Sequence, residues 1–191
     1  EAHAGDLIAI AGLKEATVAD TICDPENTEP VRALPVDPPT LSMSFSINDS
    51  PFAGNDGDKV TSRLLAARLA RESEGNVAIE VERTGDENTF EVRGRGELQL
   101  GVLIEQLRRE GFELSVSRPR VLYRESFETG GREEPMEEVV IDVDDQYVGA
   151  VVEALGKRKG EMTDMRPSGG GKTRVVFLAP ARGLIGYHGQ F

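Results

Sequence analysis

The sequence is poor in the residues that most metal and redox sites require. Among its 191 residues it has one cysteine, two histidines and no tryptophan. The single cysteine, Cys23, excludes an intramolecular disulfide, a cysteine-ligated zinc site and an iron–sulfur cluster. Because His3 and His188 are the only histidines, a histidine-rich metal site is excluded as well. We therefore expect no metal site. We also expect no catalytic residue, since no serine, cysteine or threonine nucleophile motif is present.

Long apolar runs are lacking too. No stretch approaches the ~18 apolar residues that a membrane span requires. The first residues show no basic region ahead of an apolar one, which a signal peptide would have. These features predict a cytoplasmic protein without a membrane partner. The chain also starts at Glu1 rather than at methionine, so we expect it to be part of a longer protein.

Charge is plentiful but unevenly distributed. The formal net charge is −12, which argues against bulk binding to DNA or other nucleic acid, because phosphate repels carboxylates. Residues 1–156 hold 32 acidic and 15 basic residues, whereas residues 157–191 hold 2 acidic and 7 basic ones. The first part is therefore at −17 and the last part at +5. A local basic excess of this kind is suited to contact with the phosphates of structured RNA. A structural role is the alternative for Lys157, Arg158 and Lys159, because cations complement the dipole at a helix end.

The first 36 residues have the pattern of a β-structure remnant followed by a linker. Residues 7–11 and 17–22 read as short strands, which are too few to form a stable sheet alone. We interpret them as the end of a larger β structure. Five prolines between residues 24 and 40 predict an extended linker, because proline has no amide donor and restricts the residue before it.

Residues 37–128 have the order β-α-β-β-α-β of a ferredoxin-like domain. Residues 41–47 alternate between apolar and small polar side chains, as a half-buried strand does. Thr61 or Ser62 is a candidate cap for a helix that ends at Gly75 and Asn76. Two strands around residues 77–81 and 90–93 form a hairpin, a second helix follows residues 94–96, and a last strand begins at residue 112.

Residues 129–191 repeat this order without its last strand. A strand is predicted at 138–143, a helix at 146–157, and a hairpin from 161–165 and 174–178. Gly183 is predicted to open the second helix. The predicted fold class is therefore α+β, with two ferredoxin-like domains after a short β remnant and the second domain incomplete.

Two glycine-rich motifs resemble nucleotide-binding loops but lack essential positions. The GGGKT run at residues 169–173 has Arg166 where a P-loop needs glycine, and it joins two strands rather than a strand and a helix. The GRG run at residues 94–96 is followed by Gln99 where a dinucleotide fingerprint needs glycine. We interpret the first as a hairpin turn and the second as a helix start. The paired carboxylates at 133–134, 137–138 and 144–145 are interpreted as an acidic surface.

Several segments together resemble the TypA/BipA family of ribosome-associated translational GTPases, relatives of elongation factor G. SPFAG at residues 50–54 and VTSRL at 60–64 are close to a loop and helix start of that family. GRGELQL at 94–100 resembles the opening of a third-domain helix shared with elongation factor G, and PARGLIGY at 180–187 resembles a fifth-domain helix. AGDLIAIAG at 4–12 and DTICD at 20–24 resemble the end of the β-barrel second domain of that family, so the resemblance implies that residues 1–36 are a β-barrel remnant with its linker. REGFELSVSRP at 109–119 extends the likeness over essentially the whole chain.

The resemblance implies a non-catalytic, ribosome-binding portion of a translational GTPase that acts in translation, ribosome assembly or stress adaptation. GTP and magnesium would be bound by a GTPase domain that this chain lacks, so no cofactor is expected here. The implied partners are ribosomal RNA, ribosomal proteins and that GTPase domain. The candidate RNA-binding residues are Lys157, Arg158, Lys159, Lys172, Arg174 and Arg182, with Arg93, Arg95, Arg118 and Arg120 as weaker candidates. The alternative is a small-molecule regulatory module of paired ferredoxin-like domains, for which a pocket between the two domains would be the distinguishing feature.

Overall fold

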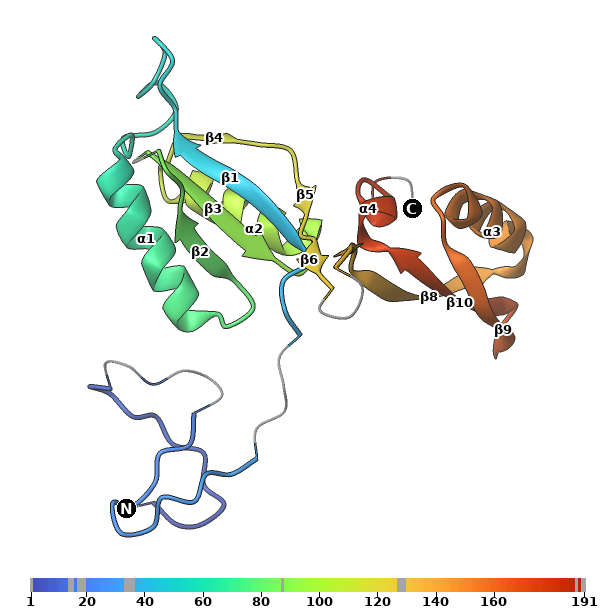
Figure 1. Cartoon of the computed structure of the whole chain (residues 1–191), viewed down its shortest axis with the longest axis horizontal. Coiled ribbons are helices and arrows are strands. Elements are labelled where there is room, and N and C mark those ends of the chain that lie inside the picture. Colours follow the sequence, from blue (N-terminus) through green and yellow to red (C-terminus); the bar gives the residue numbers. More distant parts are fainter. Residues whose placement is uncertain are drawn as a thin grey trace.

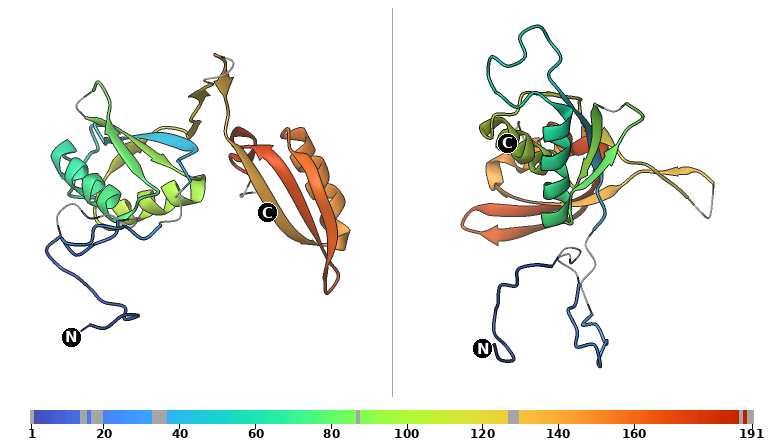
Figure 2. Two further views of the ribbon diagram at one scale, coloured as in Figure 1. Left: turned by 60° about the horizontal axis from the view of Figure 1, so that its bottom comes forward. Right: turned by 90° about the vertical axis from the view of Figure 1, so that its left-hand side faces the viewer.

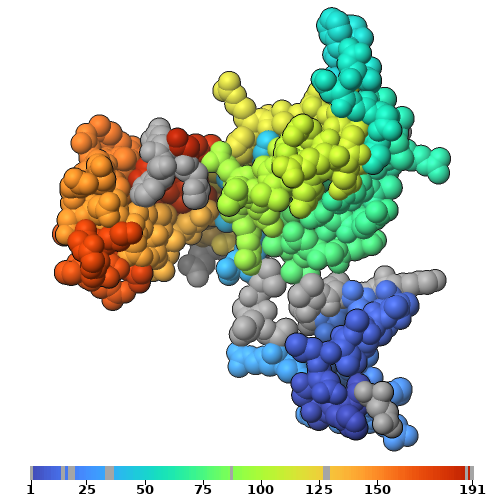
Figure 3. Space-filling model, turned by 180° about the vertical axis from the view of Figure 1, so that it is seen from behind, coloured from blue at the N-terminus to red at the C-terminus, as the bar shows by residue number. Residues whose placement is uncertain are grey.

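The computed structural model describes residues 2–13, 16, 20–32, 37–86, 88–126, 130–187 and 189, and it has an α+β fold (Figure 1). The predicted fold class is confirmed. Two bodies, each with its own sheet and helices, lie beside one another, and the N-terminal segment runs separately from both (Figure 1). The space-filling view from behind shows the same arrangement, with the N-terminal segment, in blue, protruding from the rest of the surface (Figure 3). None of the described helices has the length and apolar content that a bilayer span requires.

The elements follow the predicted order. In the first domain they are β1 (Leu41–Ile47), α1 (Ser62–Gly75), β2 (Glu80–Arg83), β3 (Thr89–Gly94), α2 (Glu97–Arg109), β4 (Leu114–Val116) and β5 (Arg120–Val121). A two-stranded connection is formed by β6 (Arg124–Glu125) and β7 (Arg132–Glu133). In the second domain they are β8 (Met136–Asp144), a 3-10 turn (Asp145–Tyr147), α3 (Val148–Lys157), β9 (Glu161–Gly169), β10 (Lys172–Pro180) and α4 (Ala181–Leu184).

The sheet of the first domain has the order β2-β3-β1-β4, with β5 also paired to β1. The pairings of β1 with β3 and β4, and of β2 with β3, are antiparallel, and Phe45 lies opposite Phe90 in the register. Phe45, Phe90 and Val92 are almost completely buried. They form one core with Leu65 and Leu69 of α1 and with three leucines of α2, namely Leu100, Leu103 and Leu107. Side chains of this size each contribute roughly 1.5–3 kcal/mol when buried. The leucines recur on one face of each helix, and their burial therefore holds both helices against the sheet.

The sheet of the second domain has the order β8-β10-β9, again antiparallel. The central strand β10 buries Val175 and Phe177 against Val151 and Leu155 of α3. Edge strand β9 is exposed along its whole length. The order matches strands one, three and two of a ferredoxin-like sheet, so a strand beside β8 would complete it.

Two sequence predictions are wrong in detail. No strand forms in residues 7–11 or 20–22, and Leu7, Ile8 and Ile10 are exposed, because the described N-terminal residues provide no sheet for them to pair with. Residues 17–19 of the second predicted strand lie outside the described residues. The last helix begins at Ala181, before Gly183, and ends at Leu184, close to Gly186 with its left-handed φ of 71°.

Two further details differ from expectation. Thr61 occupies the N-cap position of α1, as predicted, but its side chain forms no capping hydrogen bond. The β6–β7 hairpin was not anticipated, and it projects away from both domains (Figure 2). Its register places Arg124 opposite Glu133 and Glu125 opposite Arg132, so opposite charges pair across the two strands.

Candidate nucleic-acid interface

The basic residues predicted in the second domain lie near opposite ends of β10. Arg158, at the end of α3, donates a 2.7 Å hydrogen bond to the carbonyl oxygen of Gly183, which places the Lys157–Lys159 run beside α4 and Arg182. Lys172 and Arg174 lie at the other end, where β10 begins. A nine-residue strand spans roughly 30 Å, so the two groups form two surfaces rather than one.

Three of these cations are ion-paired within the chain. Arg174 donates two hydrogen bonds of 2.9 and 2.6 Å to Asp142, and its guanidinium holds the pKa of that carboxyl below its ordinary value. Arg182 pairs with Glu134 at 2.6 Å. Lys157 pairs with Glu153 one helical turn earlier, also at 2.6 Å. Exposed pairs of this kind are worth about 0–1 kcal/mol, so a phosphate could replace the carboxylate at small cost.

The weaker candidates of the first domain also include both engaged and exposed arginines. Arg93 contacts Glu91 and Glu82, with nitrogen–oxygen distances of 2.7 and 2.6 Å. Arg95 donates a hydrogen bond to the carbonyl oxygen of Asp37. Arg118 and Arg120 are exposed and form no ion pair with the residues that the structure describes. Arg93 is therefore the most strongly held of the four, within a cluster of acidic side chains.

Lys159 is exposed and has an unusual backbone conformation. It is the only non-glycine residue with a positive φ, 69°, among those described. Its amide donates to the carbonyl of Gly156, and the amide of Gly160 donates to the carbonyl of Leu155. These two bonds form a Schellman motif at the end of α3, in which the left-handed position is usually glycine. Its ammonium group forms no ion pair within the described part of the chain.

Arg158, in contrast, is engaged inside the domain. Besides Gly183, its guanidinium donates to the carbonyl oxygen of Ile185 at 3.2 Å. It also lies over the ring of Tyr187, 5.1 Å from the centroid. Three contacts with one short segment make Arg158 the residue that organises the 183–187 turn.

That turn forms part of a joint between the two domains. The amide of Gly186 donates a 2.7 Å hydrogen bond to Oε2 of Glu97 at the start of α2. Ile185 packs against the core of the first domain. On the other side of the joint, the hydroxyl of Thr40 donates to the carboxylate of Glu137 at 3.3 Å.

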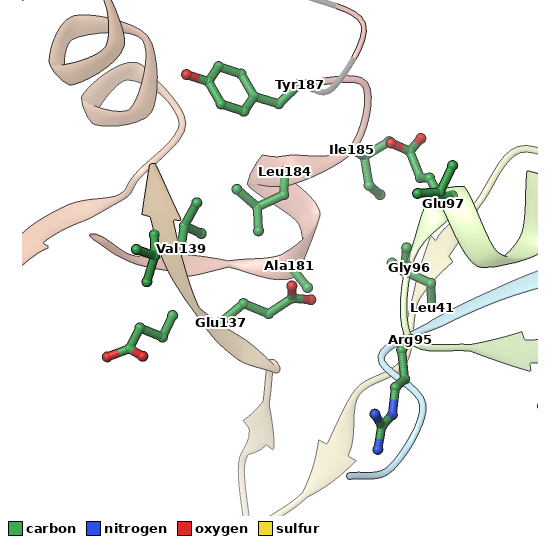
Figure 4. Close-up of a pocket in the computed structure, with 13 residues that line it drawn as sticks. Leu41, Arg95, Gly96, Glu97, Glu137, Val139, Ala181, Leu184, Ile185 and Tyr187 are labelled. Carbon is green, nitrogen blue, oxygen red and sulfur yellow. The ribbon is translucent and has the colours of Figure 1, made fainter. Parts of the chain in front are cut away.

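A pocket of about 310 Å³ lies in this joint (Figure 4). Its lining comes from both domains: Leu41, Arg95, Gly96, Glu97 and Leu98 from the first, and Glu137, Glu138, Val139, Val140, Ala181, Leu184, Ile185 and Tyr187 from the second. Figure 4 shows Ile185 close to Glu97, and Leu184 directed toward the strand that carries Val139. The cavity is largely apolar with three carboxylates and one guanidinium around it.

Sequence reasoning did not find the joint or the role of Glu113, a carboxylate of the first domain with a strongly lowered pKa. Glu113 is buried and accepts hydrogen bonds from the amides of Gly54, Asp56 and Gly57. Amides of this loop, together with the Asn48 side chain, lower the pKa of Glu113 to about 2. The loop carries the SPFAG motif, so Glu113 holds that loop rather than a substrate. Within the described residues, no group of three or more His, Cys, Asp or Glu is placed to hold a metal ion.

Comparison with known proteins relates the second domain to elongation factor G and the whole chain to ribosomal subunit assembly factors. A family model described as the elongation factor G C-terminus matches residues 132–191. Curated relatives from several bacteria carry the name "Large ribosomal subunit assembly factor BipA". Those of Salmonella typhimurium and Haemophilus influenzae are each 53% identical over 190 residues, and that of Buchnera aphidicola is 46% identical over 191. Each match covers 100% of this chain and 30–31% of the relative, so the chain spans about a third of the length of these proteins.

One solved structure is also similar in part. It is a crystal structure of a Thermus thermophilus protein that matches 84% of this chain and 38% of its own. The two chains are 14% identical in sequence, and the TM-score is 0.47.

Proposed function

Because the chain belongs to the TypA/BipA family of translational GTPases, we propose that it is the ribosome-binding, non-catalytic portion of such a protein. In this proposal the exposed end of α3 contacts RNA of the large ribosomal subunit. This is the subunit that appears in the names of the relatives. GTP and magnesium belong to a GTPase domain elsewhere in the whole protein, and the two domains described above relay the state of the ribosome to it. Association with the ribosome implies a cytoplasmic location.

The observation that carries the proposal is the conformation of Lys159. A left-handed backbone costs an ordinary residue about 1–2 kcal/mol, whereas glycine adopts it freely. A non-glycine residue held there is a reason to look for function. The lysine at this position is exposed and unpaired among the described residues, and it follows Lys157, whose only ion pair is a surface one. An exposed ammonium group carried by a tight turn is suited to a phosphate, which it would meet as a point charge.

The experiment compares three substitutions at the ends of β10 in the full-length protein. Lys159→Gly removes the charge and keeps the turn, Lys159→Arg keeps the charge, and Lys172→Gln removes a charge at the other end of β10. The affinity for purified large ribosomal subunits is measured over a series of salt concentrations. We expect Lys159→Gly to weaken binding and to reduce the log–log salt slope by about one. Lys159→Arg should keep the slope of the unmodified protein.

Two results would reject the interface. One is an unchanged affinity and slope for Lys159→Gly, and the other is an equal loss for Lys159→Gly and Lys172→Gln. The second result would indicate a diffuse attraction rather than a contact at the end of α3. A double Lys157→Glu and Lys159→Glu variant, with two reversed charges, provides the largest expected loss.

The joint pocket supports a second candidate, the small-molecule regulatory module. A pocket of about 310 Å³ is at the lower end of the range for ligand sites, and its apolar lining with a few polar groups is typical of them. This candidate predicts a ligand-dependent rise in melting temperature in the absence of ribosomes. The ribosome-binding candidate predicts no such dependence, so a thermal-shift screen with metabolites distinguishes the two.

A further inference from the structure

Arg158 connects the proposed RNA-facing turn with the joint between the domains. Its neighbours Lys157 and Lys159 are exposed, while Arg158 itself is half-buried. Its guanidinium donates to the carbonyl oxygens of Gly183 and Ile185 and stacks on Tyr187. The backbone of Arg158 is equally close, because a side chain at Gly183 would overlap the Arg158 carbonyl oxygen.

The segment that Arg158 holds is the one that reaches the first domain. Within four residues, 183–186, the chain accepts two hydrogen bonds from Arg158, places Ile185 against the first core and donates from Gly186 to Glu97. A displacement of the guanidinium therefore removes the support of the turn that makes the joint. Figure 1 shows α4, the start of this segment, on the side of the second domain that faces the first.

We propose that Arg158 is a switch residue with two alternative partners: the carbonyls of the 183–187 turn when the protein is free, and an RNA phosphate when the Lys157–Gly160 turn is occupied. This inference rests on the proposed RNA contact at Lys159. A guanidinium bonds a phosphate more strongly than it bonds neutral carbonyls, since both partners are then charged and two parallel N–H···O bonds can form. Binding of RNA at the turn therefore draws Arg158 away from Gly183 and Ile185 and loosens the joint.

The chemistry requires arginine. The planar guanidinium offers five donors, so it bonds two carbonyls and stacks on a ring at the same time. A lysine at this position would keep the attraction for phosphate as a point charge, but it would not reproduce the stacked, two-carbonyl arrangement. Arg158→Lys therefore removes the contacts with the 183–187 turn and keeps the attraction for phosphate.

The test measures the distance between the domains in the full chain. Cys23, its only cysteine, is changed to serine, and spin labels are attached at Glu74→Cys on α1 and Ala150→Cys on α3, both exposed positions. Distance distributions are recorded for the free chain and in the presence of purified large ribosomal subunits. The matched control is Arg166→Lys, which makes the same change at an arginine paired with Asp164 on β9.

The inference predicts a narrow distribution for the free chain and a shifted, broader one with ribosomal subunits. For Arg158→Lys it predicts the broad distribution in both conditions, with an affinity equal to or tighter than that of the unmodified chain, because no joint has to open. Arg166→Lys should behave as the unmodified chain does. Thermal unfolding of Arg158→Lys verifies that its second domain is folded.

Three outcomes would overturn the inference. The first is a free Arg158→Lys chain with the narrow distribution, and the second is an unmodified chain whose distribution stays narrow when bound. The third is a loss of binding by Arg158→Lys as large as that of Lys159→Gly, which would make Arg158 a simple contact. Failure of the proposed function is recognised separately, since Lys159→Gly would then leave ribosome binding unchanged whatever the free-chain distances show.

Discussion

The amide of Gly186 donates a 2.7 Å hydrogen bond to the carboxylate of Glu97, and this bond joins two domains across 89 positions of the sequence. Around it lie the contact of Ile185 with the first core and the hydrogen bond of Thr40 to Glu137. The joint is thus made of few interactions. Small interfaces of this kind allow relative motion of domains.

Removing the Glu97 carboxylate should weaken the joint without unfolding either domain. A hydrogen bond to a charged group contributes about 1.5–3 kcal/mol, and partial solvent exposure places this one at the lower end. We expect Glu97→Ala to lower the stability of the joint by about 1.5 kcal/mol. The measurement is the rate of limited proteolysis in the connection between the domains, which should rise severalfold. Glu105→Ala, on the exposed side of the same helix, is the control, and equal rates for the two variants would refute the role of Glu97.

The Glu113 carboxylate should make the stability of the first domain depend on acid pH. Its pKa is about 2 in the folded protein, because the amides of Gly54 and Asp56 stabilise the charged form, and 4.5 is its ordinary value. The folded state therefore binds protons less readily than the unfolded state. The contribution of Glu113 is complete above about pH 4.5 and is lost as the pH falls toward 2.

Urea unfolding at pH values between about 2 and 6 measures this contribution. We expect Glu113→Gln to remove a large part of the pH dependence in this window. The pKa of Glu105 is also about 2, but its partners Arg108 and Arg109 are exposed side chains, so salt should screen that contribution. In high salt the pH dependence of Glu105→Gln should match that of the unmodified chain, while the effect of Glu113→Gln persists. A Glu113→Gln profile that coincides with the unmodified one would contradict the assignment.

Two glycines of the first domain should respond oppositely to alanine. A side chain at Gly57 would overlap the carbonyl oxygen of Gly111, whereas nothing lies within 4 Å of one at Gly101 in α2. Gly57→Ala forces two backbone segments apart, and we expect a loss of about 1–3 kcal/mol. Gly101→Ala improves helix propensity and should add about 1 kcal/mol. Chemical unfolding of both variants checks the pair, and a stabilised Gly57→Ala chain would show that the loop is not packed as described.

Sequence periodicity was sufficient for the elements that bury a regular apolar face. The leucines of α2 and the alternation along β1 and β3 are local patterns, and the structure places them in one core. The same reasoning failed for residues 7–11, because a strand is defined by a partner that the described N-terminal residues do not provide. It also failed for the start of α4, where Gly183 is required by its contact with Arg158 rather than by a helix start.

The candidate site was predictable in composition but not in arrangement. The excess of basic residues after position 156 is visible in the sequence, yet the pairing of Arg174 with Asp142 and of Arg182 with Glu134 depends on the folded sheet. Nothing in the spacing distinguishes Arg158 from Lys157 and Lys159, although one faces inward and the others outward. The partners that make this difference, Gly183 and Ile185, lie 25 and 27 positions away.

The conformation of Lys159 leads to a prediction about stability that is independent of any partner. Its φ of 69° is one that glycine adopts without strain. Lys159→Gly should therefore stabilise the second domain by about 1 kcal/mol, even though glycine gives the unfolded chain more freedom. Lys159→Asn should give a smaller gain, because asparagine tolerates this region better than lysine does. Thermal unfolding followed by calorimetry measures both variants.

The control for this prediction is a glycine introduced where the backbone is ordinary. Lys157→Gly lies in the last turn of α3 and should destabilise the same domain by roughly 1 kcal/mol. If Lys159→Gly were as destabilising as Lys157→Gly, the Schellman turn at the end of α3 would be wrong. If Lys159→Gly is more stable and also binds ribosomal subunits more weakly, then the lysine is retained at this turn for its charge and against the preference of the fold.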